Sequence, residues 1–169
     1  MRARRLGAAG ALVAYIATIP AANMAVTHFG VVPVGLGYLA PAGVYLVGIA
    51  LVLRDVARET AGRWPVAVAV LVGAALSYWL ASPELATASA AAFALSEGLD
   101  FMVYEPLRKR GLIIAMLASN LVGMIADSLV FLTLAFGSLQ FLPGQLLGKA
   151  WMTVAAVVAI AARRRFASI

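Results

Sequence analysis

The longest uncharged stretch of the chain constrains the fold more than any other feature. No Lys, Arg, Asp or Glu occurs between Leu6 and Leu53. A helix that crosses a bilayer needs about 20 mostly apolar residues, so this stretch is too long for one such helix and fits two. We expect them to be joined near His28, Gly30 and Pro33, because glycine and proline interrupt helices. The stretch therefore predicts a chain that uses lipid, rather than water, as its solvent.

Apolar runs continue through the rest of the sequence. Hydrophobic residues make up 64% of the 169 residues and charged residues 12%, against about 45–50% and about 25% in soluble domains. We expect an all-α integral membrane protein with one membrane domain over residues 1–169 and six transmembrane helices. The predicted spans are about 7–27, 34–53, 64–81, 85–105, 111–136 and 143–162.

The basic residues lie in four short clusters that fall on one side of a six-span arrangement. The clusters are Arg2/Arg4/Arg5, Arg54/Arg58/Arg63, Arg108/Lys109/Arg110 and Arg163/Arg164/Arg165. The loops expected on the opposite side contain no Lys or Arg. Because basic loops stay in the cytoplasm, this pattern predicts a multi-pass protein of the inner or plasma membrane with both termini cytoplasmic. The same placement argues against nucleic acid as the partner of this basic chain. We expect its partner to be the lipid bilayer.

Four ionisable residues lie inside apolar runs, where they are costly and usually functional. They are Glu97, Asp100, Asp127 and Lys149. Neutral polar residues accompany them in the same or neighbouring runs: Asn23, Ser119, Asn120, Ser128 and Gln145. Groups of this kind cannot face lipid, so they either line a shared interior cavity or pair with one another.

Helical spacing divides most of these residues into three groups, each on one face of a helix. The groups are Glu97 with Asp100 and Tyr104, Asn120 with Gly123 and Asp127, and Gln145 with Lys149. Asp127 and Lys149 have similar predicted heights and opposite charges, which predicts a contact across the fifth and sixth helices. That contact suits a packing ion pair as well as a binding site, and Asn120 suits interhelical hydrogen bonding. Glu97 and Asp100 favour ligand binding, because one buried cation leaves their negative charge in excess.

Four short motifs carry a resemblance to a known family. Glu97, Asp100, Val103 and Tyr104 form E-x-x-D-x-x-V-Y; Ser119, Gly123, Asp127 and Ser128 form S-x-x-x-G-x-x-x-D-[ST]; Gln145 and Lys149 form Q-x-x-x-K; Asp55, Glu59 and Gly62 form D-x-x-x-E-x-x-G. In order and spacing they resemble the vitamin-uptake-transporter-like family, also called the queuosine precursor transporter family. The chain departs from it in its short loops and in the more basic stretch at 54–58.

The resemblance implies import of a 7-deazaguanine such as preQ0, preQ1 or queuine. Such a base presents adjacent N–H donors that one carboxylate can accept, amides can complete the pattern, and aromatic rings can sandwich the base. The predicted substrate-binding residues are Asn23, Glu97, Asp100, Tyr104, Asn120, Asp127, Gln145, Lys149 and Trp151, with Phe93 and Phe101 as further ring candidates. Glu97 and Asp100 are the residues on which this hypothesis depends most.

Other functions stay open at this point. The chain also suits a substrate-binding subunit of an energy-coupling-factor importer, which needs a partner ATPase module, and, less well, a membrane enzyme or assembly factor. Motifs of catalytic or metal sites such as HExxH and GxSxG are absent from the sequence. We therefore predict no catalytic residues, metal or cofactor. Homodimer formation and the driving force, whether protons, sodium or none, stay open.

Overall fold

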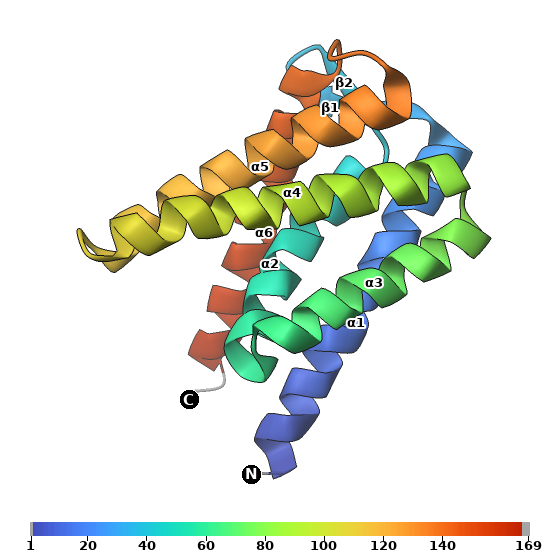
Figure 1. The fold of residues 1–169 in the computed structure, drawn as a ribbon. Coiled ribbons are helices and arrows are strands. Elements are labelled where there is room, and N and C mark those ends of the chain that lie inside the picture. Colours follow the sequence, from blue (N-terminus) through green and yellow to red (C-terminus); the bar gives the residue numbers. More distant parts are fainter. Residues whose placement is uncertain (1, 167–169) are drawn as a thin grey trace.

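Six helices and one β-hairpin make up the described part of the chain (Figure 1). The computed structural model describes residues 2–166, and it describes the side chains of 7–111, 114–115, 118–155 and 158. In chain order the elements are α1 (Arg2–Phe29), β1 (Val31–Gly35), β2 (Tyr38–Pro41), α2 (Val44–Ala61), α3 (Arg63–Leu80), α4 (Pro83–Arg108), α5 (Leu112–Phe136) and α6 (Leu142–Phe166).

The β-hairpin corrects the predicted second span, because residues 34–41 are not helical. The two strands pair antiparallel, with Val31 opposite Pro41 and Gly35 opposite Tyr38. The turn between them contains Leu36 and Gly37, both with positive φ, at 52° and 79°. Two glycines around a left-handed turn, next to β-branched valines, favour a hairpin over a helix. A hydropathy average misses this, because it counts apolar side chains and ignores backbone conformation.

The ends of the other helices follow from local chemistry. Ser82 caps α4, where its hydroxyl oxygen accepts a hydrogen bond of 3.2 Å from the backbone N–H of Leu85. Pro83 follows in the first turn, where a missing N–H costs nothing. Gly62 separates α2 from α3 with a φ of 92°, and Gly137 ends α5 in a left-handed conformation. These residues make the connections between the helices short.

The helices pack in two groups around an interior space. α4 and α5 lie along each other as an antiparallel pair, while α1 packs against α2 and α3, and α2 packs against α6 (Figure 1). Gly48 lets α2 approach α6 closely, since a Cβ there would lie 2.5 Å from Cβ of Met152. Gly144 does the same for the hairpin, because a Cβ there would overlap the carbonyl oxygen of Leu39. The hairpin is therefore seated on the first turn of α6.

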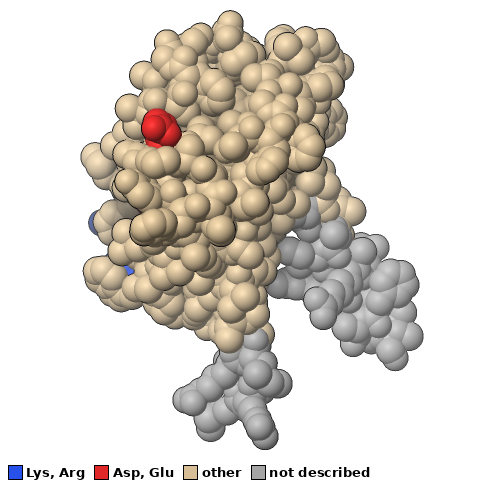
Figure 2. Space-filling view, turned by 90° about the vertical axis from the view of Figure 1, so that its right-hand side faces the viewer, with Lys and Arg blue, Asp and Glu red and all other residues tan. Residues whose placement is uncertain are grey.

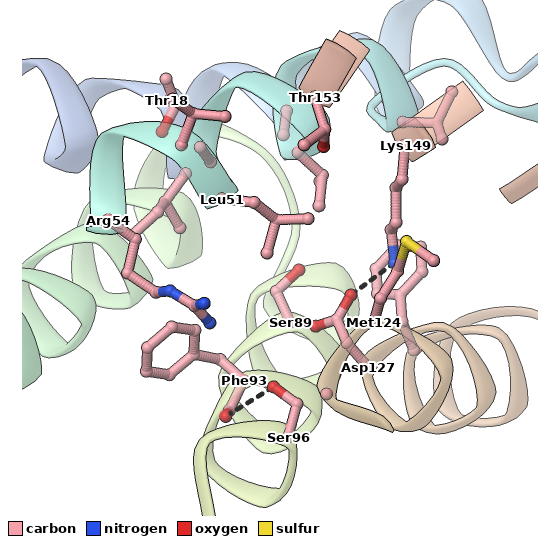
Figure 3. A pocket seen from close by; sticks show the side chains of 18 of the residues that line it. Thr18, Leu51, Arg54, Ser89, Phe93, Ser96, Met124, Asp127, Lys149 and Thr153 are labelled. Carbon is pink, nitrogen blue, oxygen red and sulfur yellow. Dashed lines mark hydrogen bonds and ion pairs between the residues drawn. The ribbon is translucent and has the colours of Figure 1, made fainter. Parts of the chain in front are cut away.

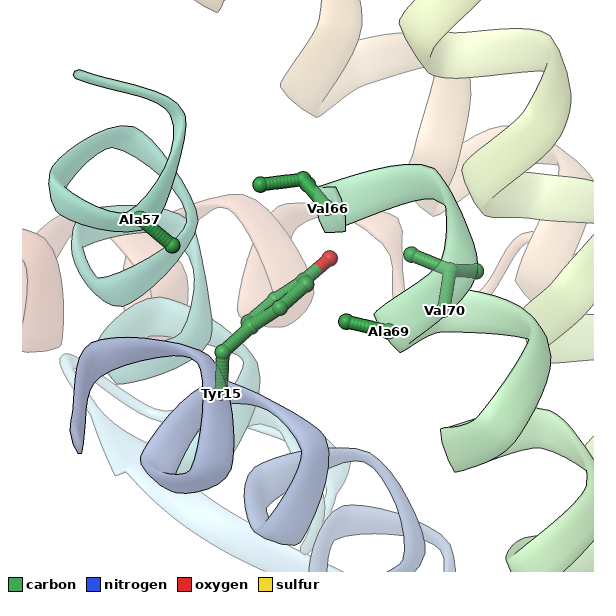
Figure 4. Packing of buried hydrophobic residues seen from close by; sticks show 5 residues of the cluster. All are labelled: Tyr15, Ala57, Val66, Ala69 and Val70. Atoms are coloured by element: carbon green, nitrogen blue, oxygen red, sulfur yellow. The ribbon is translucent and has the colours of Figure 1, made fainter. Parts of the chain in front are cut away.

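The main apolar cluster joins α1, α2 and α3. Figure 4 shows its buried members, Tyr15, Ala57, Val66, Ala69 and Val70. The ring of Tyr15 also faces Phe93 of α4, with the ring centroids 6.5 Å apart. Ala57 and Ala69 have small side chains, which let the helices approach closely there, as in other membrane proteins.

Many large apolar side chains are exposed on the outer surface, and among the described residues three helices are long and apolar enough to cross a membrane. These segments are Gly7–Phe29, Arg63–Leu80 and Ala118–Phe136. On α3 the large residues Trp64, Leu71 and Trp79 are 70–83% exposed. Charged side chains are rare over the part of the molecule drawn in colour in Figure 2. An exposed apolar surface of this extent is stable in lipid and not in water, so the chain is a membrane protein.

Candidate substrate cavity

A cavity of about 670 Å³ is lined by residues of all six helices, α1 to α6. Most of its lining is apolar, for example Val44, Leu51 and Phe93, and a few polar groups enter from several helices (Figure 3). A volume of a few hundred Å³ with apolar walls and few polar groups is typical of a site for one small organic molecule.

Six of the nine predicted binding residues line this one cavity. They are Asn23, Asp100, Asn120, Asp127, Gln145 and Lys149. They come from four helices and from positions more than 120 residues apart in the sequence. Helical spacing on separate spans therefore identified groups that the fold brings together around one space.

The other three predicted residues lie outside the cavity lining. Glu97 adjoins it through its ion pair with Arg54. The ring of Tyr104 lies 6.0 Å from the guanidinium of Arg108 instead. Trp151 is 54% exposed, because it follows Lys149 by two residues, which is about 200° around a helix. Of the aromatic residues considered for a ring sandwich, Phe93 lines the cavity, whereas Phe101 is 45% exposed.

Arg54 is the central charged residue at one side of the cavity, and its burial was not predicted. It is only 5% exposed. Its guanidinium donates to Glu97, to Oδ1 of Asp55 at 2.9 and 3.1 Å, and to Oδ1 of Asn120 at 3.3 Å. Arg54 therefore connects α2 with both α4 and α5 across the cavity.

The hairpin explains why sequence reasoning missed Arg54. The predicted span 34–53 placed Arg54 at the cytoplasmic end of its helix, whereas α2 begins ten residues later and runs to Ala61. Arg54 consequently lies three turns inside α2. The signal that could have found it was the turn Gly35–Leu36–Gly37, which moves the start of the helix beyond Pro41.

The carboxyl groups of Glu97 and Asp100 on α4 are paired with arginines, so the expectation that they carry unpaired negative charge is wrong. Arg58, one turn after Arg54, has its Nη1 3.5 Å from Oδ2 of Asp100 and 3.9 Å from Oε2 of Glu97. Among the residues whose side chains the structure describes, two cations are buried, Arg54 and Lys149, instead of the single one expected. Glu97 and Asp100 share a helix face as predicted, but both already have cationic partners.

A second charged cluster lies across the cavity from Arg54, as Figure 3 shows. Nζ of Lys149 donates to Oδ2 of Asp127 at 2.6 Å and to Oγ of Ser128 at 2.7 Å. Lys149 is 1% exposed, so its charge depends on these partners. The predicted contact between the fifth and sixth helices is therefore present.

Comparison with known families decides the class of this protein. Residues 77–163, a little over half of the chain, match the family described as Putative vitamin uptake transporter. The chain belongs to this family. The matched range includes α4, α5 and most of α6, and with them Glu97, Asp100, Asp127 and Lys149. Searches of curated proteins and of solved structures gave no match.

Membership confirms the resemblance that the motifs predicted. It makes the chain a transporter of the vitamin-uptake type, located in a membrane. Three of the helices that line the cavity, α4, α5 and α6, lie wholly or largely within the matched range.

Proposed function

We propose that this uptake transporter imports a 7-deazaguanine precursor of queuosine, such as preQ0, preQ1 or queuine. The observation that carries the proposal is the convergence of carboxyl and amide side chains on one mostly apolar cavity of about 670 Å³. A planar base has two apolar faces and a polar edge. Apolar walls such as Phe93 and Leu51 suit the faces, and Asp100, Asn120 or Asp127 suit an edge rich in donors.

The proposal predicts rescue of a precursor auxotroph. Cells that cannot make 7-deazaguanines, but can still insert them into tRNA, should regain queuosine when they express this protein at low external precursor. Labelled preQ0, preQ1 and queuine should accumulate in the same cells. The measurements are the queuosine content of tRNA and the initial rate of uptake.

Two controls separate this proposal from its competitors. Labelled guanine tests whether uptake depends on the 7-deaza ring, and removal of the host's energy-coupling-factor ATPases tests the need for an ATPase module. Absence of rescue by every 7-deazaguanine, with normal expression in the membrane, would remove the substrate assignment and leave the transporter class. Loss of uptake with the ATPases would favour the substrate-binding subunit instead.

We also propose six spans with both termini in the cytoplasm. The support is the alternation of the basic clusters and the length of the apolar helices α1, α3 and α5. Reporter fusions at the N-terminus, at Gly62, at Arg110 and after Ile169 should all read cytoplasmic, and a fusion in the hairpin at Gly37 should read external. An external signal at either terminus is incompatible with this topology.

A further inference from the structure

Each of two buried amide side chains of the cavity lining has one atom that lacks a hydrogen-bond partner among the described residues. Asn23 is 3% exposed and Gln145 is 2% exposed. Within the part of the chain that the structure describes, Nδ2 of Asn23 and Oε1 of Gln145 have no hydrogen-bond partner. A buried polar atom without a partner costs free energy and calls for an explanation. Because both residues line the cavity, a bound molecule is the simplest source of the missing partners.

The two amides belong to the same end of the cavity, close to the hairpin. Asn23 lies in the last two turns of α1, and its Oδ1 accepts a hydrogen bond of 2.8 Å from Ser89 in the second turn of α4. Gln145 lies in the first turn of α6, next to Gly144, against which the hairpin is seated. Lys149 lies one turn further along α6, so its ion pair with Asp127 belongs to the same end of the cavity.

The opposite side of the cavity does not show this lack of partners. There Arg54 donates to Asp55, Glu97 and Asn120, so these groups satisfy one another. A ligand that bound on that side would have to compete with ion pairs that are already formed. Recognition is favoured where protein groups need a partner, which is at Asn23 and Gln145.

The two atoms without hydrogen-bond partners determine which chemical groups a bound ligand must present to them. Nδ2 of Asn23 is a donor and Oε1 of Gln145 is an acceptor. The terminal torsions of Asn and Gln rotate over a broad range, so both amides can turn toward a ligand. The matching edge carries one acceptor and one donor side by side, as the C=O and N–H of a lactam do.

We propose that Asn23 and Gln145 form the subsite that binds the lactam edge of the transported ring. The identity of that ring, a 7-deazaguanine, rests on the function proposed above. The C=O of the lactam accepts from Asn23, and its N–H donates to Gln145. Glu97, which sequence reasoning placed at the centre of the site, stays in the ion-pair network on the other side.

Binding to the purified transporter tests this subsite with two matched probes. 7-Deazaguanine has the lactam, whereas 2-amino-7-deazapurine keeps the ring and the amino group but lacks the C=O and the adjacent N–H. We expect the wild type to bind 7-deazaguanine at least tenfold more tightly. Gln145→Met and Asn23→Leu should each weaken that binding about tenfold to a hundredfold, with little effect on the second probe.

A third residue provides a control. Oγ of Ser77 on α3 is also buried without a partner among the described residues, but Ser77 does not line the cavity. Ser77→Ala should leave binding unchanged. The thermal midpoint of Gln145→Met without ligand should not fall, since an unsatisfied polar atom is replaced by an apolar one. If Asn23→Leu does not fold, Gln145→Met alone decides the test.

The outcomes separate the subsite from the proposed function. Binding of 7-deazaguanine by both variants within twofold of the wild type overturns the subsite and leaves the function standing. An equal loss in Ser77→Ala also overturns it. A further outcome is that the wild type binds neither probe but binds uracil or pterin, and that this binding is lost in Gln145→Met. In that case the substrate assignment fails and the lactam subsite stands. Binding of no lactam at all overturns both.

Discussion

Replacing Arg54 by methionine should reduce uptake to background and destabilise the protein by about 3–5 kcal/mol. Arg54 is 5% exposed and holds Glu97, whose side chain is 25% exposed, together with Asp55 and Asn120. Methionine fills much of the same volume but leaves the Glu97 carboxylate without this partner in a largely apolar surrounding. The loss of a buried partner costs more than the pair contributes, because the remaining carboxylate is only partly hydrated and keeps only the more distant Arg58, at 3.9 Å.

The measurements are the thermal midpoint of the protein in detergent and uptake at matched expression. Arg58→Met is the paired control, since Arg58 is one turn away, its side chain is 33% exposed and its carboxylate partners lie at 3.5 and 3.9 Å. It should cost less than Arg54→Met, because its side chain is partly hydrated and its contacts are longer, although it leaves the buried carboxylate of Asp100 without this cation. The double variant Arg54→Met/Glu97→Met should recover much of the lost stability. Equal midpoints for Arg54→Met and the wild type would show that the network does not stabilise the fold.

Neutralising one member of the Asp127–Lys149 pair should be more harmful than neutralising both. Lys149 is 1% exposed, with Nζ 2.6 Å from Oδ2 of Asp127. Lys149→Met leaves a carboxylate, and Asp127→Asn leaves a buried ammonium that retains only the hydroxyl of Ser128. Each single variant should lose about 3–5 kcal/mol of stability, and the double variant distinctly less than the sum.

Stability and uptake, measured on the same four proteins, separate the two roles of this pair. If the double variant regains both, the pair serves packing. If it regains stability and still transports nothing, one or both side chains contact the substrate. Single variants as stable as the wild type would contradict the buried ion pair itself. Thr133→Val, on the exposed side of α5, is a control that should change neither quantity.

The interior polar groups were predictable from the sequence because each depends on one helix. Gln145 and Lys149 are four residues apart, and Asn120, Gly123 and Asp127 repeat with the same period, so each set shares a face of any helix that contains it. An ionisable group in an apolar run must avoid lipid, which places these faces toward the interior. These two local facts predict interior positions, and the packing of the helices decides that the groups line one cavity.

The partner of each carboxyl group was predictable only where the helices are neighbours with similar predicted heights. Asp127 and Lys149 met that condition, and their contact is present. Glu97 and Arg54 are 43 residues apart, and their pairing depends on how far α2 extends. Because the hairpin residues are apolar, hydropathy did not show where α2 begins. The predicted helix therefore began ten residues too early, and the predicted heights of its residues in the membrane were wrong by the same shift.

Three properties were determined by the sequence alone. They are the location of the chain in a lipid bilayer, the segments that are helical over most of their length, and the helix faces that turn toward the interior. These properties depend on the composition and period of contiguous residues, and the bilayer penalises every alternative. Only the tertiary structure decided that residues 31–41 form a hairpin, that Arg54 is buried among carboxyl groups, and that Asn23 and Gln145 lie at the same end of one cavity. Those outcomes depend on left-handed glycines and on packing between distant helices, and neither changes the hydropathy from which the spans were predicted.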